Sequence, residues 1–269
     1  MLAELALWLA TPASRMTRRL GLVSESVALW ARGRRQRKAW AEHHRRCRAL
    51  IAEVVAELPC RRGVAVLGSG LLRDIPLALL RERFGRVLLV DAVHLPHIRL
   101  AAALRPDVTL VMRDLSGIMD WLGGEQDGRV DPVADLVADE TLDLIISANL
   151  MSQLGWPVED WLDDHAGPAA ALPTNLPARC IAWHRDDLAR FPGRVVLLTD
   201  VETEEHDRAG TVHDRFDLMR GTALPPHDEG WDWHVVPFGE VEADRETVHR
   251  VRAWRDFGAA CRRSAEAGR

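Results

Sequence analysis

The chain has 269 residues, of which 47% are hydrophobic and 28% are charged, and its formal net charge is −5. Its longest apolar runs, such as LALWLATPA near the start, are much shorter than the roughly 20 residues of a membrane-spanning helix. Glu4 stands where an export signal carries positive charge. We therefore expect no membrane span and a cytoplasmic protein, and the net negative charge argues against nonspecific nucleic-acid binding by the whole chain.

The four cysteines are far apart and none forms a CxxC pair. Closely spaced cysteines are the usual sign of a zinc site or of a dense disulfide framework. The sequence therefore predicts no metal site and a reduced setting.

Residues 1–58 are predicted to form an N-terminal helical segment. Within it, apolar residues recur at spacings that place them on one face of a helix, namely Trp40, Cys47, Ile51, Val54 and Leu58. Basic residues crowd the same segment, mostly elsewhere around the helix. The pattern is typical of an amphipathic helix that packs on the main domain with a solvated basic face. RNA, an anionic lipid or an acidic substrate remain alternative partners of that face.

Residues 59–269 are predicted to form the main domain, in which short apolar strands alternate with amphipathic helices. The strand candidates are GVAVLGSG, RVLLVDAVH, VTLVMRDLSG, LDLIISANL and RVVLLTDVE, and the helix candidates are LRDIPLALLRERF, LPHIRLAAALR and HRDDLARF. Such strands belong to a parallel sheet that is covered on both faces. The right-handed crossover rule then predicts a doubly wound α/β sheet.

Two regions rich in Gly, Pro and Asp interrupt this alternation and are predicted to be loops or insertions, Gly123–Glu140 and Asp163–Pro177. The segment Thr203–Gly230 is long for a loop, and long loops of this kind are often lids. After it, WDWHVVPFGE and TVHRVRAWRDF are predicted to be two strands with a short polar connection. The mostly parallel sheet should therefore end in an antiparallel hairpin.

The stretch GVAVLGSGLLRD, residues 63–74, has the character of a ligand-binding turn. Gly68 and Gly70 follow an apolar strand, so the backbone there can approach a ligand closely. A tight strand-to-helix turn is the alternative. The nicotinamide fingerprint G-x-G-x-x-G requires a third glycine where this chain has Arg73, which disfavours NAD.

Acidic residues at the ends of the next two strands support a nucleoside-containing cofactor. Asp91 ends the second strand about 20 residues after the glycines, a spacing at which a carboxylate reaches ribose hydroxyls. Asp114 ends the third strand, where its carboxylate can accept from an adenine amine while Leu115 lies against the ring. A helix cap or a solvated loop position is the structural alternative for each aspartate.

These motifs resemble those of the class I S-adenosylmethionine-dependent methyltransferases. VAVLGSG is similar to their first motif, VLLVDAV to their acidic second strand, MRDLSG to the adenine-contacting strand end, and LDLIISANLMSQL to the fourth strand. The terminal hairpin matches their sixth and seventh strands, so the resemblance covers about Leu58 to Phe257. The chain departs from the family at Val66, where an acidic residue is usual, and at Leu72, where many members have a third glycine.

The resemblance implies a site for S-adenosyl-L-methionine. The residues that it assigns to this cofactor are Gly68, Ser69, Gly70, Asp91, Ala92, Asp114, Leu115 and Asn149. No D/N-P-P-Y/F sequence follows the fourth strand, so methylation of nucleic-acid or glutamine amino groups is not indicated.

A general base is required only if the methyl acceptor arrives protonated. Ligands of open α/β sheets lie at the carboxyl ends of the strands, which favours Asp200, with Asn149 and His213 as further catalytic candidates. Other polar residues near these strand ends are Ser152, Gln153, His184 and Glu202.

The sequence therefore predicts a methyltransferase of a small-molecule or peptidyl acceptor. A binding or scaffold protein that retains the fold without turnover, and a nicotinamide-dependent oxidoreductase, remain the alternatives. Fold by itself does not distinguish them.

Overall fold

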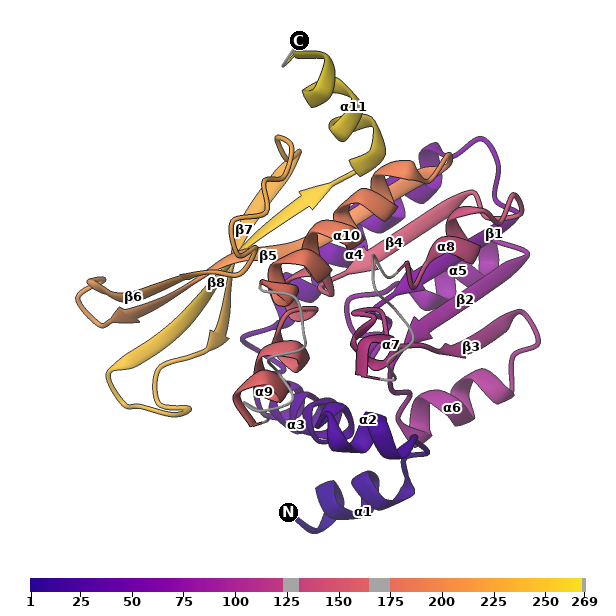
Figure 1. The fold of residues 1–269 in the computed structure, drawn as a ribbon. Coiled ribbons are helices and arrows are strands. Elements are labelled where there is room, and N and C mark those ends of the chain that lie inside the picture. The colour runs from indigo at the N-terminus through magenta and orange to yellow at the C-terminus, as the bar shows by residue number, and fades with distance from the viewer. Residues whose placement is uncertain (123–130, 165–174, 268–269) are drawn as a thin grey trace.

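A computed structural model of the chain describes residues 1–122, 131–164 and 175–267. Its centre is an eight-stranded sheet in the order β3-β2-β1-β4-β5-β8-β7, with β6 paired to the outer part of β5 (Figure 1). The strands are β1 Gly63–Leu67, β2 Arg86–Asp91, β3 Val108–Met112, β4 Leu144–Ala148, β5 Arg194–Asp207, β6 Val212–Asp217, β7 Glu229–Val236 and β8 Arg245–Trp254. The first five are parallel and the last three pair antiparallel. The predicted doubly wound sheet and its terminal hairpin are confirmed.

Helices cover both faces of the parallel part. They are α1 Leu2–Ala10, α2 Arg15–Arg19, α3 Leu22–Arg35, α4 Ala41–Glu57, α5 Leu77–Arg83, α6 Pro96–Ala103, α7 Ile118–Leu122, α8 Ala134–Val137, α9 Trp156–Asp164, α10 Leu176–Arg190 and α11 Phe257–Ala267, with a 3₁₀ turn at Met151–Gln153. One core packs α10 and α11 on the sheet, and a second packs α4 and α5 on its other face. Strands β1 and β4 are buried along their whole length, which explains why they are almost entirely apolar.

The N-terminal segment divides into four helices, and α4 is the amphipathic helix that the sequence predicts. Cys47, Ile51 and Val54 are fully buried in the core that α4 shares with β1. Helix α3 instead packs on the loop after β2, where Val27 meets Val93 in a small separate cluster. The N-terminal helices thus cover the carboxyl ends of β1 and β2.

The helix after the glycine loop is shorter than predicted. The sequence predicts helix over residues 72–84, whereas α5 begins at Leu77 and the residues before it form turns. Leu72 has φ of 58°, a left-handed conformation that cannot continue a right-handed helix. Pro76 also disfavours helical backbone at the residue before it. The glycine loop is therefore followed by an extended turn and not directly by a helix.

The prediction of a long loop over Thr203–Gly230 is wrong. Strand β5 continues to Asp207, turns back through Gly210 into β6, and β7 starts at Glu229. Figure 1 shows β6 and the outer halves of β5 and β8 projecting beyond the helical layers. Because both faces of this extension are partly solvated, its strands are rich in charged residues and do not show the apolar run that marks a buried strand.

The two predicted loop regions are described only in part. Residues 123–130 and 165–174 lie outside the described residues. Of the rest, Ala134–Val137 is helix α8, α9 extends to Asp164, and α10 begins at Leu176. Helix occurs at the edges of both regions, where the sequence predicts loop.

Candidate functional site

The glycine loop lies at the point where the strand order reverses, between β1 and β4. Gly68 and Gly70 have φ of 71° and 45°, so both positions require left-handed backbone. A Cβ on Gly68 would lie 2.7 Å from the Cβ of Leu150, which fixes the loop against the segment after β4. A Cβ on Gly70 would meet nothing closer than the Gly68 carbonyl oxygen at 3.7 Å. The two glycines therefore differ: Gly68 is required by packing, and Gly70 faces open space.

The Asp91 carboxylate contacts the glycine loop directly. Its Oδ2 accepts from the Gly70 N–H at 2.7 Å and its Oδ1 from the Val93 N–H at 3.3 Å. Burial raises the pKa of Asp91, and these backbone bonds oppose that effect. The structure thus brings together the two elements that the sequence assigns to the cofactor. Ala92 lies beside them, packed against the cluster under α3.

The Asp114 carboxylate accepts hydrogen bonds from the loop that follows it. One carboxylate oxygen accepts from the N–H and the hydroxyl of Ser116, at 2.9 and 2.6 Å, and the other accepts from the Met119 N–H at 2.9 Å. This is how a side chain caps the start of a helix, here α7. Leu115 is 5% exposed and packs in the core. These contacts fit the structural alternative that the sequence left open for this strand end.

Asn149 follows β4 in left-handed backbone, with φ of 49°. Its side-chain amide donates to Asp74 Oδ2 at 2.6 Å, and its backbone carbonyl oxygen accepts from Gln153 Nε2 at 2.6 Å. Burial raises the pKa of Asp74, while the bond from Asn149 opposes that effect. Asp74 is a site residue that the sequence reasoning missed, although it lies in the quoted glycine-loop stretch.

His43 of α4 is a second residue that the sequence reasoning missed. The Trp231 indole N–H donates to its Nδ1 at 3.1 Å, and the ring stacks on Trp233 with centroids 4.0 Å apart. Its Nε2, which then carries the proton, can donate to Cys47 Sγ at 3.7 Å; Asn149 Nδ2, itself a donor, is 3.4 Å away. Burial, followed by the charge of His44, lowers the pKa of His43 to about 3, so the ring is neutral. Its position four residues before Cys47, on the apolar face of α4, was the signal in the sequence.

Asp200 on β5 has two side-chain partners. The Ser152 hydroxyl donates to Oδ1, and His249 Nδ1 contacts Oδ2. Burial acts to raise the pKa of Asp200, but the hydrogen bond and charge of His249, together with Ser152, lower it below its ordinary value. The Trp233 ring that stacks on His43 also meets the His249 ring edge-on, with centroids 5.8 Å apart, so Asp200, His249 and His43 form one cluster. His249 was not predicted, because β8 brings it there by long-range strand pairing.

The remaining candidates lie outside this cluster. His213 is on β6 and pairs with Asp207 at 2.8 Å. Since β6 pairs with the outer end of β5, His213 is roughly 20 Å along the strand from Asp200. Glu202 pairs with Arg215 at 3.7 Å. His184 packs under β4 on Ser147, and burial lowers its pKa to about 4. The structure thus separates His213 from Asn149 and Asp200.

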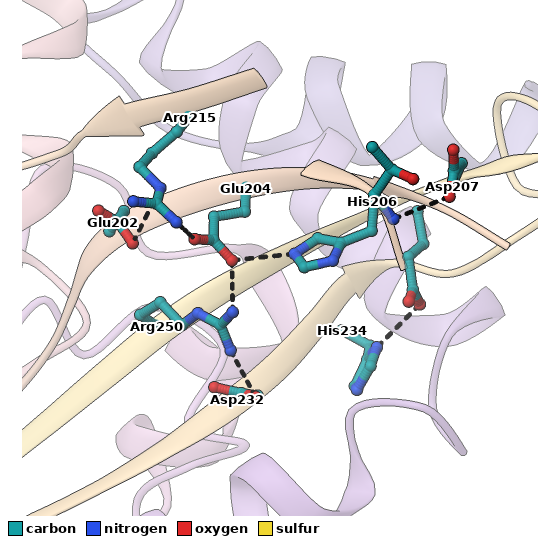
Figure 2. A network of polar contacts seen from close by, with 10 residues as sticks. Glu202, Glu204, His206, Asp207, Arg215, Asp232, His234 and Arg250 are labelled. Carbon is teal, nitrogen blue, oxygen red and sulfur yellow. Dashed lines mark hydrogen bonds and ion pairs between the residues drawn. The ribbon is translucent and has the colours of Figure 1, made fainter. Parts of the chain in front are cut away.

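A charged network occupies the antiparallel extension (Figure 2). Glu204 is its centre: one carboxylate oxygen contacts Arg250 and, at 2.9 Å, His206, and the other contacts Arg215 at 2.5 Å. Burial acts to raise the pKa of Glu204, but hydrogen bonds from Arg250, His206 and Arg215 lower it to about 2. Arg250 also binds Asp232 at 2.6 Å, which ties β7 to β8 and β5. This network stabilises the extension.

Two shallow cavities, of about 330 and 310 Å³, lie away from the glycine loop. The first is between α6 and β3, and the second is between β5, β8 and the segment after β6. Neither is lined by a predicted cofactor residue. Over the described ranges, His, Cys, Asp and Glu form no group that could hold a metal ion. No described helix is both long and apolar enough to cross a bilayer.

No family model and no curated protein matches the chain. Among solved structures, the chain is similar to the Burkholderia thailandensis 1,6-didemethyltoxoflavin-N1-methyltransferase, which was solved with 1,6-didemethyltoxoflavin and S-adenosylhomocysteine. The two sequences are 17% identical, the match covers 91% of this chain and 92% of that chain, and the TM-score is 0.40. A Leishmania major SAM-dependent methyltransferase of the DUF858 family has 12% identity, covers 93% and 82% of the two chains, and gives a TM-score of 0.32. The 23S rRNA methyltransferase ErmE has 12% identity, with 78% and 70% covered and a TM-score of 0.27.

At these TM-scores and identities the similarities assign no substrate to this chain, and the fold is argued from its own topology. Five parallel strands in the order β3-β2-β1-β4-β5 carry the glycine loop at the reversal point, and the terminal pair β7 and β8 extends the sheet antiparallel from β5. This is the arrangement that the resemblance predicts, with β6 as an addition. The chain has a mixed α/β fold whose mostly parallel sheet ends in an antiparallel strand pair.

Proposed function

We propose that the protein is a methyltransferase that binds S-adenosyl-L-methionine at the carboxyl ends of β1, β2 and β4 and methylates a small-molecule or peptidyl acceptor beside Asp200. One observation carries the proposal: the Asp91 carboxylate and the Gly70 N–H are in contact at the reversal point of the strand order. Ligands of open α/β sheets bind in the crevice at that point.

The residues present fit this cofactor on two counts. Ser69 Oγ and Asn149 Oδ1 are buried and have no hydrogen-bond partner among the described residues, and both belong to the segments that follow β1 and β4. Buried polar atoms of this kind normally have a partner, so their presence supports a polar ligand here. Gly70 leaves room for a close approach to the backbone. Gly68, Ser69, Gly70, Asp91, Ala92 and Asn149 would hold the cofactor, while Asp114 and Leu115 fit less well because their own loop and the core already engage them.

Bound S-adenosyl-L-methionine supplies an electrophilic methyl group on a sulfonium. The protein's part is alignment, exclusion of water and removal of a proton from the acceptor. His249 contacts Asp200 through Nδ1, so its Nε2 is left with a lone pair that can take a proton. Asp200, held as a carboxylate, fixes that tautomer and stabilises the charged ring. We assign the proton-accepting role to the Asp200 and His249 pair, with Ser152 orienting the carboxylate.

Calorimetric titration of the purified protein with S-adenosylhomocysteine and with NAD tests the cofactor. We expect binding of S-adenosylhomocysteine and none of NAD. Gly70→Val should abolish binding, because a side chain would fill the approach to the backbone. Gly210→Val is the matched control: Gly210 also has positive φ, at 81°, and open space around it, but lies in the turn between β5 and β6. Equal binding by the Gly70→Val variant would contradict the proposed site.

A second variant pair tests the ribose contact. Asp91→Ala should weaken S-adenosylhomocysteine about 10- to 150-fold, which corresponds to a lost charge-assisted hydrogen bond of about 1.5 to 3 kcal/mol. Asp91→Asn retains an acceptor for the Gly70 N–H and separates loss of the charge from loss of the loop contact. If neither S-adenosylhomocysteine nor NAD binds the wild type at millimolar concentration, the scaffold alternative holds. Tighter binding of NAD supports the oxidoreductase.

A further inference from the structure

Helix α1 presents apolar side chains to solvent. Leu2, Leu5 and Leu9 are 86%, 55% and 65% exposed, and their spacing of three and four residues places them on one face of the helix. The opposite face is already used, because Leu7 and Trp8 pack against the cluster of α3 that contains Val23 and Val27. The helix is therefore apolar on two sides, and packing among the residues that the structure describes accounts for only one of them.

Positive charge surrounds this helix. Residues 1–58 contain 11 basic and 5 acidic residues, whereas the rest of the chain is acidic overall. Arg34 and Arg35 are exposed at the end of α3, the helix on which α1 packs. The Arg18 guanidinium lies 4.5 Å from the centre of the Trp8 ring and donates to the Thr11 carbonyl oxygen at 2.6 Å, beside the last turn of α1. Basic side chains thus lie beside the last turn of α1 and at the end of α3, where Arg34 lies over the Trp30 ring and Arg35 is 3.5 Å from Glu240 Oε1.

Figure 1 shows α1 at the periphery, away from the sheet. An apolar helical face bordered by arginines is the arrangement of helices that lie in the interface of an anionic bilayer. Leucines enter the acyl boundary, while guanidinium groups bind lipid phosphates. The acidic remainder of the chain would be repelled by the same surface, which orients the protein with α1 toward it. RNA would use the arginines but not the leucines.

We propose that α1 docks the protein on an anionic lipid bilayer through Leu2, Leu5 and Leu9, with Arg18, Arg34 and Arg35 at the phosphate layer. The docking surface is the face of α1 opposite to the one that packs in the cluster with Ala92. Docking through it does not depend on the proposed methyl transfer.

Co-sedimentation of the full chain with large vesicles tests this proposal. We expect binding to vesicles of phosphatidylcholine with 25% phosphatidylglycerol and weak binding to phosphatidylcholine alone. Replacing Leu2, Leu5 and Leu9 together by Gln should lower the vesicle partition coefficient at least about tenfold. The matched control replaces Leu100 and Leu104, which are 66% and 76% exposed near α6, by Gln and should bind as the wild type does. The double variant Arg34→Gln/Arg35→Gln should bind the anionic vesicles more weakly, and its binding should depend less on salt concentration.

Because the three leucines are exposed, their replacement should leave the thermal unfolding midpoint unchanged. Light scattering of the same variants without vesicles distinguishes a lipid surface from contact between two copies of the chain. A wild type that is dimeric and becomes monomeric in the triple variant would overturn the lipid proposal. So would equal binding of the triple variant and the wild type, or equal binding to neutral and anionic vesicles.

Discussion

Strand β5 carries two buried carboxylates four residues apart, Asp200 and Glu204, which are 5% and 2% exposed. Each contacts a histidine, His249 and His206 respectively. Glu204 is also bound by Arg215 and Arg250, whereas the other partner of Asp200 is the Ser152 hydroxyl. The two carboxylates thus share a strand and a partner type, and differ in whether arginines neutralise them.

This difference separates Glu204, whose charge stabilises the fold, from Asp200, whose histidine partner can exchange a proton. Arginine keeps its proton at any working pH, so the charge of Glu204 is permanently compensated and holds three strands together. The compensating partner of Asp200 is an imidazole, a group that can accept and release a proton in a reaction. We therefore expect changes at Asp200 to affect chemistry and changes at Glu204 to affect stability.

Asp200→Asn should give the largest effect. The amide cannot stabilise a protonated His249, so methyl transfer should fall at least about 100-fold. Transfer of tritium from labelled S-adenosyl-L-methionine to the pooled small molecules of a cell extract measures the loss. Affinity for S-adenosylhomocysteine should stay within about threefold of the wild type. Glu202→Gln, two residues along β5, is the control and should transfer normally; a wild-type rate in Asp200→Asn would refute the assignment.

Glu204→Gln should destabilise the fold by about 3 kcal/mol at pH 7, because it removes the charge-assisted hydrogen bonds that Arg250, Arg215 and His206 make to this buried carboxylate. The folded pKa of Glu204, about 2, lies below the ordinary value of 4.5. Its contribution is therefore complete above about pH 4.5 and is lost as the pH falls toward 2. Urea unfolding of the wild type and of Glu204→Gln at pH 7 and at pH 3 tests this. The difference between their free energies of unfolding should be smaller at pH 3.

Glu205→Gln is the matched control for Glu204. Its side chain is 41% exposed and its ion pair with Arg245 is 3.7 Å long, so its replacement should cost less than about 0.5 kcal/mol. Equal losses in the two variants would show that the arginines around Glu204 do not make its charge structural.

His43→Phe should cost about 1 to 2 kcal/mol at pH 7, since the buried Trp231 N–H loses its acceptor. The folded pKa of His43, about 3, is below the ordinary 6.5, so its neutral form stabilises the fold above about pH 6.5. That contribution is lost as the pH falls from 6.5 toward 3, so the difference in free energy of unfolding between the wild type and His43→Phe should narrow over the same range. Trp231→Phe removes the same hydrogen bond but keeps the imidazole, so it should keep the pH dependence. If urea unfolding gives the same difference in free energy between the wild type and His43→Phe across that range, His43 is not held neutral by burial.

A small effect is also expected from the basic face of the N-terminal segment. Arg34, Arg35 and Arg37 are exposed, as the sequence predicts, so changing all three to Gln should alter the free energy of unfolding by less than about 1 kcal/mol. Urea unfolding measures this change. A larger loss would mean that the basic face stabilises the fold, in contrast to its solvated position.

Much of the fold could be predicted from local patterns. Strands β1 and β4 are apolar along their length because both of their faces are covered, and such a run is visible in a short window. The extension was missed for the opposite reason: β6 is exposed at every position, so no apolar alternation marks it. The start of α5 was placed too early because the left-handed turn at Leu72 is unusual for a leucine.

The sequence by itself determined the chain order of β1–β5, β7 and β8, the glycine loop and the acidic ends of β2 and β3, because each depends on neighbours within a few residues. Only the tertiary structure decided which polar groups meet. Trp231 reaches His43 across 188 residues, Asn149 reaches Asp74 across 75, and His249 reaches Asp200 across 49. These pairs depend on the register of β8 on β5 and on the docking of α4, which burial of the whole core sets and no local pattern encodes.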